Sequence, residues 1–463
     1  MDSIDRALQE SAALPAALGA QGAPARLAEF SSFDGQVRET AWHQRPDRYR
    51  HLEAPVPDAL PRIARGAGLS YAAASFGAGV VVQEMTRFSR ILEHDDDAGT
   101  VTVEAGTTIG DLLSWSLARG RYLPVVPGHP DITVGGCIAA DVHGKNPGRD
   151  GTFRDSVAAL TLYHPDRGFL SVSPESDPEW FDATCGGFGL TGIIVAATLN
   201  LLPLPAPSVR LTARPVRSLG QAADLISSGA APFSYSWHGA VRASETLGRG
   251  LVFSGDWSDA PVARPEPRRR PALTAESRAA LRVCLWNPFT AVAASHAFRT
   301  ASTARRQPRH LSFFDCCFPF ERQTLYHRFF GARGLREIQL LVPVERSELL
   351  FTRLAALVRE RRPTITFLSL KSFLGRARAL SLSGSGLLLA LDYVRDSTSA
   401  AFESAMDRML LDLGAQPNVS KDSRLPARIV AETLPTYPAF RQQIHRLDPR
   451  RRFQSELSRR LEL

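Results

Sequence analysis

Short apolar runs separated by glycine turns mark the first half of the chain. Five of these runs have the length and residue content of β-strands: 62–65, 79–83, 101–104, 156–163 and 192–202. Residues 109–119 carry apolar side chains at helical spacing, and Thr108 directly before them is a suitable N-cap. The proline-rich segment 202–207 then predicts a linker. The pattern therefore indicates a first domain that ends near residue 205.

The pattern changes after this linker. Residues 208–412 alternate predicted strands and helices, and the segment 258–273 combines proline with arginine, which is typical of a mobile loop. After residue 413 the chain is short, polar and basic, so we expect it to pack back on one of the larger parts. Residues 1–30 predict a short helix and a loose leader.

Composition indicates a globular protein, because 44% of the 463 residues are hydrophobic and 22% are charged. No apolar run is long enough to predict a transmembrane helix, and the first residues lack the basic and apolar regions of a secretory signal. The five cysteines form no CxxC pair, which favours reduced thiols. We therefore expect a cytoplasmic protein, with peripheral contact at a membrane as an option.

The formal net charge of +8 allows an anionic partner: nucleic acid, a membrane face or a phosphorylated substrate. The basic residues are spread along the chain without a nucleic-acid-binding module, so we expect no nucleic-acid partner. Only three of the 55 basic residues are lysines: Lys145, Lys371 and Lys421. An ammonium can lose its proton when desolvated and a guanidinium cannot, so these positions are candidates for chemistry. The alternative is three surface residues left by chance.

Three glycine clusters, 64–71, 127–137 and 185–192, fall within the first domain. Glycines let a backbone approach a pyrophosphate closely, and the chain has neither a Walker A motif nor a Rossmann fingerprint. A phosphate-bearing cofactor held by the loops of a non-Rossmann fold fits all three. Between the second and third clusters, His143, Lys145 and Asn146 stand close together beside glycine, which favours a site over a solvated loop.

The segments ARGAGLSY, VEAGTTIGDLL, VPGHPDITVGGCIAADVHGKN and CGGFGLTGII together resemble the FAD-binding domain of the vanillyl-alcohol-oxidase / p-cresol-methylhydroxylase (VAO/PCMH) flavoproteins, and among these the decaprenylphosphoryl-β-D-ribose 2′-oxidases. The resemblance runs from about residue 55 to 205. It returns in residues 420–424 and 448–463, and it is weaker around residues 334–343 and Lys371.

This resemblance implies an α+β, two-domain flavoprotein with FAD as its cofactor. After an N-terminal extension (1–30), the FAD-binding domain of PCMH type would cover residues 31–205. An antiparallel-sheet substrate-binding or cap domain would cover residues 206–412, and the C-terminal segment 413–463 would return to the FAD domain.

The resemblance also implies a set of cofactor-binding residues: Ala64, Arg65, Gly66, Ala67, Gly68, Leu69, Ser70, Tyr71, Gly128, Thr133, Val134, Gly135, Gly136, Ala140, Asp141, Val142, His143, Ile194 and Asn418. Many family members bind FAD covalently through a histidine where this chain has Leu69, and some add a cysteine where it has His129. Leucine has no nucleophile, so we expect noncovalent FAD. No metal is predicted.

By the same resemblance, Lys421, Tyr71 and His143 are the catalytic candidates, and Lys145, Gln339, Lys371 and Lys421 would bind the substrate. Lys421 could stabilise negative charge at the flavin as an ammonium, or accept the hydroxyl proton as a neutral amine. The sequence leaves this choice open. All three lysines fall on the predicted site.

Some positions depart from the family. Leu388 and Ala390 stand where the ribose oxidases carry polar or thiol side chains, and Glu337 stands where they carry an amide. The adjacent Cys316 and Cys317 have no counterpart, and we interpret them as small buried hydrophobic residues. These departures leave the sugar and its carrier open.

The predicted function is FAD-dependent oxidation of a sugar secondary alcohol, a ribose-type 2′-hydroxyl to a ketone, with hydride passing to flavin N5. This would be the first half of an epimerisation on a polyprenyl-phosphate sugar, which an NAD(P)H-dependent ketoreductase would complete. The reduced flavin would pass its electrons to a quinone, oxygen or another acceptor. The alternatives are an oxidase of a soluble sugar, nucleoside or polyol in secondary metabolism, and a noncatalytic flavin-binding subunit.

Overall fold

The computed structural model describes residues 22–57, 60–229, 231–239, 247–262, 283–305, 308–319 and 324–463. The helix expected near the N-terminus falls outside these ranges, and so does most of the loop expected at 258–273. Residues 25–30, which we had assigned to the N-terminal extension, form most of strand β1 (Ala25–Ser31), which pairs with β2 (Arg38–Gln44).

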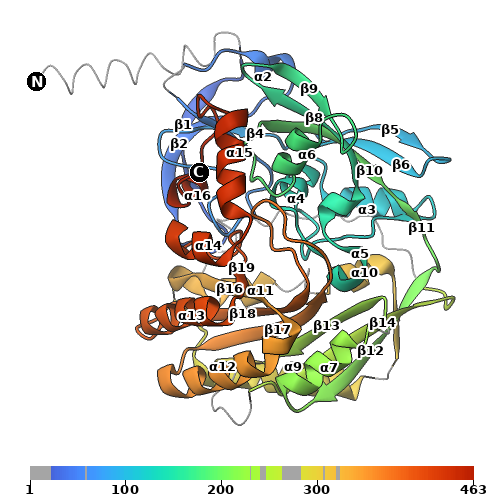
Figure 1. The fold of residues 1–463 in the computed structure, drawn as a ribbon. Helices are drawn as coiled ribbons and strands as arrows, with labels where there is room; N and C mark the ends of the chain where they lie inside the picture. The colour runs from blue at the N-terminus through green and yellow to red at the C-terminus, as the bar shows by residue number, and fades with distance from the viewer. Residues whose placement is uncertain are drawn as a thin grey trace, which may run out of the picture.

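Two sheets form the upper half of the molecule in Figure 1. The first has the order β1-β2-β4-β3, with β3 (Arg62–Arg65) and β4 (Val81–Glu84) parallel to each other. The second is antiparallel, with the order β5-β6-β10-β8-β9. Its strands are β5 (Ile91–Asp95), β6 (Thr100–Glu104), β10 (Ile193–Asn200), β8 (Val157–His164) and β9 (Gly168–Val172).

Helices and short elements fill the connections of this half: α2 (Arg50–Glu53), α3 (Ile109–Leu117), α4 (Val134–Ala140), α5 (Pro147–Asp150), η1 (Phe153–Ser156) and α6 (Pro178–Thr184). The predicted cap of α3 is confirmed, because the Thr108 side chain accepts a hydrogen bond of 3.2 Å from the amide of Asp111. The strand expected at 79–83 begins later, at Val81. Gly79 has a φ of +66°, a turn conformation that cannot continue a strand.

An antiparallel sheet of eight strands forms the lower half, with the order β15-β12-β14-β13-β17-β18-β16-β19. The expected linker contains the short strand β11 (Leu202–Pro203), which pairs with β7 (Arg121–Tyr122). The large sheet comprises β12 (Ser208–Val216), β13 (Phe233–His238), β14 (Gly250–Ser258), β15 (Arg309–Leu311), β16 (Leu335–Val342), β17 (Ile365–Phe373), β18 (Gly386–Val394) and β19 (Gln416–Pro417).

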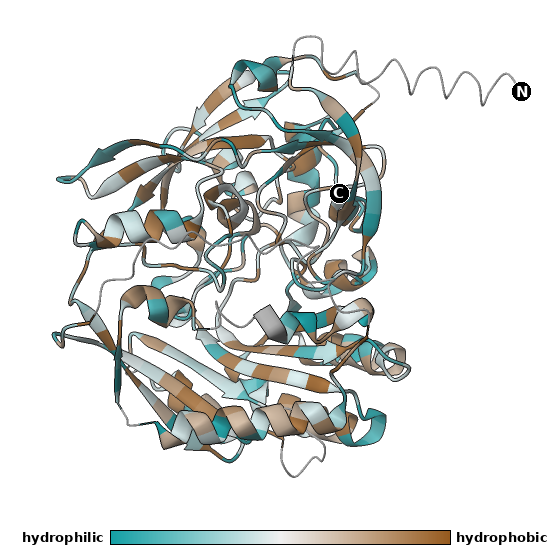
Figure 2. Cartoon of the chain, turned by 180° about the vertical axis from the view of Figure 1, so that it is seen from behind, coloured by the Kyte–Doolittle hydropathy of each residue, from teal (hydrophilic) through white to brown (hydrophobic). Residues whose placement is uncertain are grey.

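Helices cover the outer face of this sheet. The side chains of α7 (Leu219–Ser227), α12 (Ser347–Arg361) and α13 (Ser399–Leu413) share one apolar core with Leu387, Leu389 and Leu391 of β18. Residues that alternate with these, Leu388, Ala390 and Asp392, lie on the opposite face, toward the upper half. Hydropathy alternates along several strands of this sheet in Figure 2, as expected when the two faces meet different surroundings. Shorter helices of this half are α9 (Pro288–Ala304), α10 (Phe313–Cys317), α11 (Thr324–Arg328), η3 (Gly331–Arg333) and η4 (Val344–Arg346).

The C-terminal segment returns to the first half, as the red helices beside β1 and β2 show in Figure 1. It contains α14 (Ala427–Thr433), α15 (Tyr437–Leu447) and α16 (Glu456–Arg460). The Arg62 amide of β3 donates to the carbonyl of Arg452 at 2.8 Å, and the Glu456 amide donates to the carbonyl of Phe76 at 2.8 Å. This return places residues 418–424, just after β19, between the two halves. Within the described ranges, no helix is both long and apolar enough to cross a membrane.

Candidate functional site

A cleft of about 1060 Å³, part of which is open to solvent, is lined by the loop after β3, by α4, by the third glycine cluster and by the loop after β19. Its lining includes most of the predicted cofactor residues: Ala64, Arg65, Gly66, Ala67, Gly68, Leu69, Ser70, Tyr71, Thr133, Gly135, Gly136, Ala140, Val142 and Ile194, together with Lys421.

The loop after β3 presents its backbone to the cleft. A Cβ added at Gly66 would collide with Thr133 Oγ1, and Gly68 has a φ of +72°, so both positions require glycine. Arg65 anchors the loop, because its guanidinium donates to Ser75 Oγ at 2.9 Å and lies 5.0 Å from the Phe30 ring centroid. Burial lowers the pKa of Arg65 to about 10. The sequence folds this loop into one tight shape with little room for side chains, which suits a phosphate chain.

The rest of the lining is largely small or apolar. Ala74 ends the predicted pyrophosphate loop, and nine further lining residues were not singled out from the sequence: Ser75, Met85, Ala105, Ile132, Ala139, Phe188, Gly189, Gly192 and Ser420. Phe188, Gly189 and Gly192 belong to the third glycine cluster, so the cluster itself could have indicated them. Ala105 and Ala139 carry no local signal, because only sheet and helix packing brings them to the cleft. Together they form an apolar wall suited to a flat aromatic ring.

Lys421 brings a positive charge to the junction of the two halves. Its Nζ lies 3.3 Å from Glu337 Oε2 on β16 and 3.9 Å from the centroid of the Tyr71 ring. Its side chain is 30% exposed, whereas that of Glu337 is only 8% exposed. The ammonium is therefore held between a carboxylate and an aromatic face while it still reaches the cleft.

A row of hydrogen bonds continues from this ion pair. Gln339 Nε2 donates to Glu337 Oε1, and Asn418 Nδ2 donates to Gln339 Oε1 at 2.8 Å. Across the sheet, Asp392 pairs in register with Glu337 and accepts a hydrogen bond of 2.8 Å from the Tyr326 hydroxyl. Burial and the nearby Glu337 raise the pKa of Asp392 well above its usual value. Gln339 thus contacts Glu337, and Asn418 contacts Gln339, but neither residue lines the cleft itself.

His143, Lys371 and Lys145 form a second polar cluster beside the first. Lys371 Nζ donates to the carbonyl of Gly144 at 3.0 Å and lies 3.4 Å from His143 Nδ1. Burial, with Lys145 and Lys421 nearby, lowers the pKa of Lys371 to about 7. Burial and Lys371 lower the pKa of His143 to about 3, so this imidazole is neutral at pH 7. The three lysines of the chain therefore share one electrostatic field.

Lys145 lies deepest in this cluster. Its Nζ donates to the carbonyl of Cys317 and lies 5.7 Å from the centroid of the Tyr235 ring. Burial lowers the pKa of Lys145. Cys316 and Cys317 are buried, as expected, and burial raises the pKa of both thiols. A low-pKa, reactive thiol is the opposite of what this pair presents.

Three further predicted cofactor residues lie outside the cleft lining. Val134 is fully buried at the start of α4, and Asp141 is buried at its C-cap, where Oδ1 accepts from the amide of Arg154 at 2.9 Å. Gly128 lies in the second glycine cluster, and a Cβ added at this position would meet no atom within 4 Å. Their roles stay predictions.

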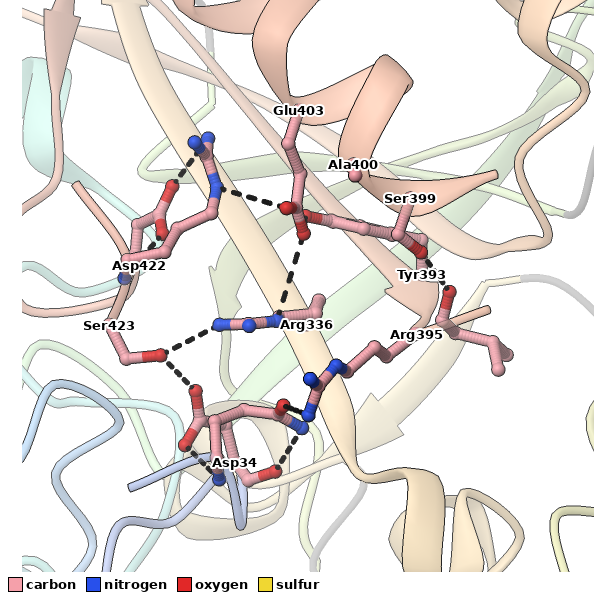
Figure 3. A network of polar contacts seen from close by, with 12 residues as sticks. Asp34, Arg336, Tyr393, Arg395, Ser399, Ala400, Glu403, Asp422 and Ser423 are labelled. Carbon is pink, nitrogen blue, oxygen red and sulfur yellow. Dashed lines mark hydrogen bonds and ion pairs between the residues drawn. The ribbon is translucent and has the colours of Figure 1, made fainter. Parts of the chain in front are cut away.

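A polar network fixes the loop that carries Lys421 (Figure 3). The Ser423 hydroxyl donates to Asp34 Oδ2 at 2.6 Å and accepts from Arg336 Nη1 at 2.9 Å. Arg424 donates to Asp407 Oδ2 on α13 at 2.8 Å and pairs with Asp422 at 2.9 Å. Because Asp34 follows β1, this network ties the beginning of the described chain, the large sheet and the loop after β19 together around Lys421.

Residues 58–171 match the protein family described as FAD binding domain. The decaprenylphosphoryl-beta-D-ribose oxidase of Mycolicibacterium smegmatis is 29% identical to this chain over 418 residues, which cover 87% of this chain and 89% of that protein. The L-gulonolactone oxidase of Mus musculus is 34% identical over 120 residues, 26% of this chain and 27% of its own.

Solved structures share the whole fold. A xylooligosaccharide oxidase from Myceliophthora thermophila C1, in complex with xylobiose, superposes with a TM-score of 0.69 at 14% identity and covers 96% of this chain and 98% of its own. A chitooligosaccharide oxidase superposes with a TM-score of 0.70 at 12% identity, with the same coverage.

The cleft fits the cofactor that these matches indicate, FAD. The glycine loop after β3 leaves room for a pyrophosphate, and the apolar wall of Ala105, Val142 and Ile194 suits the flavin ring. Among the described residues that line the cleft there is no histidine or cysteine, and Leu69 occupies the first-loop position. This lining supports the expectation of noncovalent binding.

Proposed function

We propose that this chain, an FAD-dependent oxidoreductase with the VAO/PCMH-type fold, oxidises a secondary alcohol of a sugar, a ribose-type 2′-hydroxyl, to the ketone. The observation that carries the proposal is the placement of Lys421, whose ammonium lies at the junction of the cleft and the large sheet. The name of the ribose oxidase relative supports a ribosyl substrate, and the two oligosaccharide oxidases support a sugar in general.

Bound FAD supplies the hydride acceptor at its N5 atom. The chain supplies position and charge. Lys421 donates hydrogen bonds to the oxygen that develops charge as the hydride leaves, and the Tyr71 ring holds its ammonium in place. Gln339, on β16, donates to Glu337 and so helps to hold the carboxylate that pairs with Lys421. The lysines Lys145 and Lys371 bring positive charge to the adjoining region, which suits a phosphate on the substrate, and His143 beside them is neutral.

The carrier of the sugar separates two versions of this proposal. In the first, the substrate is a polyprenyl-phosphate sugar at a membrane face, the chain is cytoplasmic and peripheral, and an NAD(P)H-dependent ketoreductase completes an epimerisation. The basic balance of the chain supports this version. In the second, the substrate is a soluble sugar, nucleoside or polyol. The buried apolar side chains of Leu388 and Ala390 support that version, because they stand where the ribose oxidases carry polar or thiol side chains.

Anaerobic reduction of the bound flavin tests the proposal. Purified holoprotein is mixed with a polyprenyl-phosphate riboside and, separately, with free ribosides, ribonucleosides and polyols, and the bleaching of the flavin absorbance is followed. Bleaching with formation of the 2′-ketone supports the proposed reaction, and the substrate that bleaches faster identifies the carrier. A flavin that stays oxidised with every sugar would refute the proposed function.

A further inference from the structure

Glu337 places a carboxylate among the three lysines of the chain. We propose that Glu337 holds Lys421 as an ammonium ion and receives the proton of the substrate hydroxyl, so that Lys421 donates hydrogen bonds and is not the base. The inference rests on the proposed function for the identity of the reaction, but the charge state of Lys421 is a property of the protein without substrate.

The ion pair has the geometry that this role requires. Lys421 Nζ lies 3.3 Å from Glu337 Oε2, and Gln339 Nε2 donates to the other carboxylate oxygen. The Glu337 side chain is 8% exposed, so little water competes for it. At this distance and low exposure, water screens the attraction between the two opposite charges only weakly. The Tyr71 ring face, 3.9 Å from Nζ, adds a second stabilising contact for the cation.

The groups that face this pair come from every surrounding element. Lys371 on β17 and Lys145 add positive charge near the pair. His143, from the loop after α4, is neutral at pH 7 because its pKa is near 3. Burial, with Lys145 and Lys421 nearby, lowers the pKa of Lys371 to about 7, and the charge of Glu337 opposes this shift.

Asp392 on β18, opposite Glu337, does not compete for Lys421 in the same way. Burial and Glu337 raise the pKa of Asp392 well above its usual value, which disfavours the charged form of Asp392. The Tyr326 hydroxyl donates to Asp392 Oδ2 at 2.8 Å and satisfies that oxygen. Of these two carboxyl groups, Glu337 therefore forms the ion pair and is placed to accept a further proton.

The proton and electrons balance in this scheme. The carbinol C–H bond breaks and its electron pair leaves with the hydrogen as hydride to bound FAD. The hydroxyl O–H bond breaks, and its proton passes to the Glu337 carboxylate, directly or by exchange through the ammonium of Lys421. The products are the ketone, FAD reduced by two electrons, a neutral Glu337 carboxyl and an unchanged Lys421 ammonium.

Because the chain has only three lysines, the charge state of Lys421 can be measured directly. Holoprotein labelled with ¹³C at lysine Cε should give three resonances, which the Lys371→Arg and Lys421→Arg variants assign. In Glu337→Gln, which keeps the size and one acceptor oxygen, we expect the Lys421 and Lys371 resonances to titrate at lower pH than in the wild type. Glu345→Gln, at an exposed position in η4, is the matched control and should leave both unchanged. A Lys421 titration that is the same in Glu337→Gln and wild type would overturn the inference.

A kinetic measurement tests the proton acceptor separately. Glu337→Gln is compared with the wild type at normal FAD content and melting temperature. We expect flavin reduction in this variant to be slower by about 10²- to 10⁴-fold at pH 7. The decrease in the rate of reduction that the wild type shows at acid pH should be absent from the variant. Glu337→Asp, which keeps the charge, should recover part of the rate. Full-rate reduction with an unchanged acid limb in Glu337→Gln would overturn the role as acceptor. If no sugar reduces even the wild-type flavin, the proposed function fails, whereas the lysine titration still decides what Glu337 does to Lys421.

Discussion

Lys421 combines two features that are rarely met by one surface lysine: an ion pair with a nearly buried carboxylate and a ring face beneath its ammonium. An arginine at this position would carry a charge as well, but it would present a planar guanidinium and not a compact ammonium. The chain uses arginine almost everywhere else, so the lysine at this point is consistent with a chemical requirement for an ammonium.

Replacement of this lysine should disable the reaction and spare the cofactor site. We expect Lys421→Gln to slow flavin reduction by sugar by roughly 10²- to 10³-fold, because one preorganised charge at the reacting oxygen is lost. The measurement is rapid anaerobic mixing with the flavin absorbance as signal. FAD content should stay at the wild-type level, and an undiminished reduction rate would contradict the role given to Lys421.

Gly66 should matter for cofactor binding. In Gly66→Ala the new Cβ would collide with Thr133 Oγ1, which caps α4, so either the loop or the cap must move. We expect FAD affinity to fall at least about tenfold, which corresponds to about 1.4 kcal/mol. Fluorescence titration of the apoprotein with FAD measures this. Gly375→Ala, where the nearest atom is 3.8 Å away, is the control, and equal affinities in both variants would argue against the tight loop.

Individual residues differ in how far the sequence reveals them. The lysines could be singled out because lysine is scarce in this chain, and the glycine loop because its spacing is local. Glu337 could be noted only as a departure from a family pattern. Its meaning depends on Lys421, 84 positions later, and on Asp392 across the sheet, and these contacts exist only after β16, β18 and the loop after β19 come together.

At the scale of elements, alternation along the strands separates a structural face from a functional one. On β16, Ile338 and Leu340 join the core under the helices, whereas Glu337 and Gln339 lie on the other face, toward the cleft. The strand pattern was predictable because its period is two. The pairing order of the eight strands was not, since it joins β16 to β18 and β19 across long stretches of sequence.

His238 on strand β13 should make the free energy of unfolding depend on pH. His238 is fully buried, its Nδ1 lies 2.8 Å from the carbonyl of Gly248, and burial lowers its pKa to about 4. The unfolded state binds the proton at higher pH than the folded state does. The stability from the neutral ring is therefore present above about pH 6.5 and is lost as the pH falls toward 4.

We expect the free energy of unfolding of the wild type to drop between pH 7.5 and 4.5, with His238 responsible for about 2 to 3 kcal/mol of that drop. Urea denaturation at both pH values, compared with His238→Gln, measures the contribution. A drop of the same size in the variant would show that His238 does not titrate in this way.

At the scale of the whole molecule, the last residues of the chain belong to the core of the first half. Leu457, Leu461 and Leu463 are buried in the same cluster as Ile63 and Phe76. The sequence suggested this return because the segment is too small to fold alone, and the family resemblance implied it as well. The consequence is that residues 418–424 are anchored at both ends, through β19 to the large sheet and through α14–α16 to the first half.

Removal of one of these buried side chains should therefore destabilise the whole protein. We expect Leu461→Ala, at 0% exposure, to lower the free energy of unfolding by about 2 to 5 kcal/mol. Leu374→Ala, where the side chain is 68% exposed, should change it by less than about 0.5 kcal/mol. Urea titration followed by both flavin and tryptophan fluorescence is the measurement. Equal effects of the two substitutions would contradict the placement of the C-terminal segment in the core.

The central claim joins a flavin cleft, a fixed ammonium and a sugar alcohol, and one experiment addresses all three. The holoprotein is mixed anaerobically with a ribosyl substrate, the flavin absorbance is recorded, and the protein is then precipitated with acid. We predict that the yellow colour bleaches in the wild type, persists in Lys421→Gln, and is released into the acid supernatant from the protein before reduction. A flavin that no sugar reduces, or that Lys421→Gln reduces equally fast, would contradict the account.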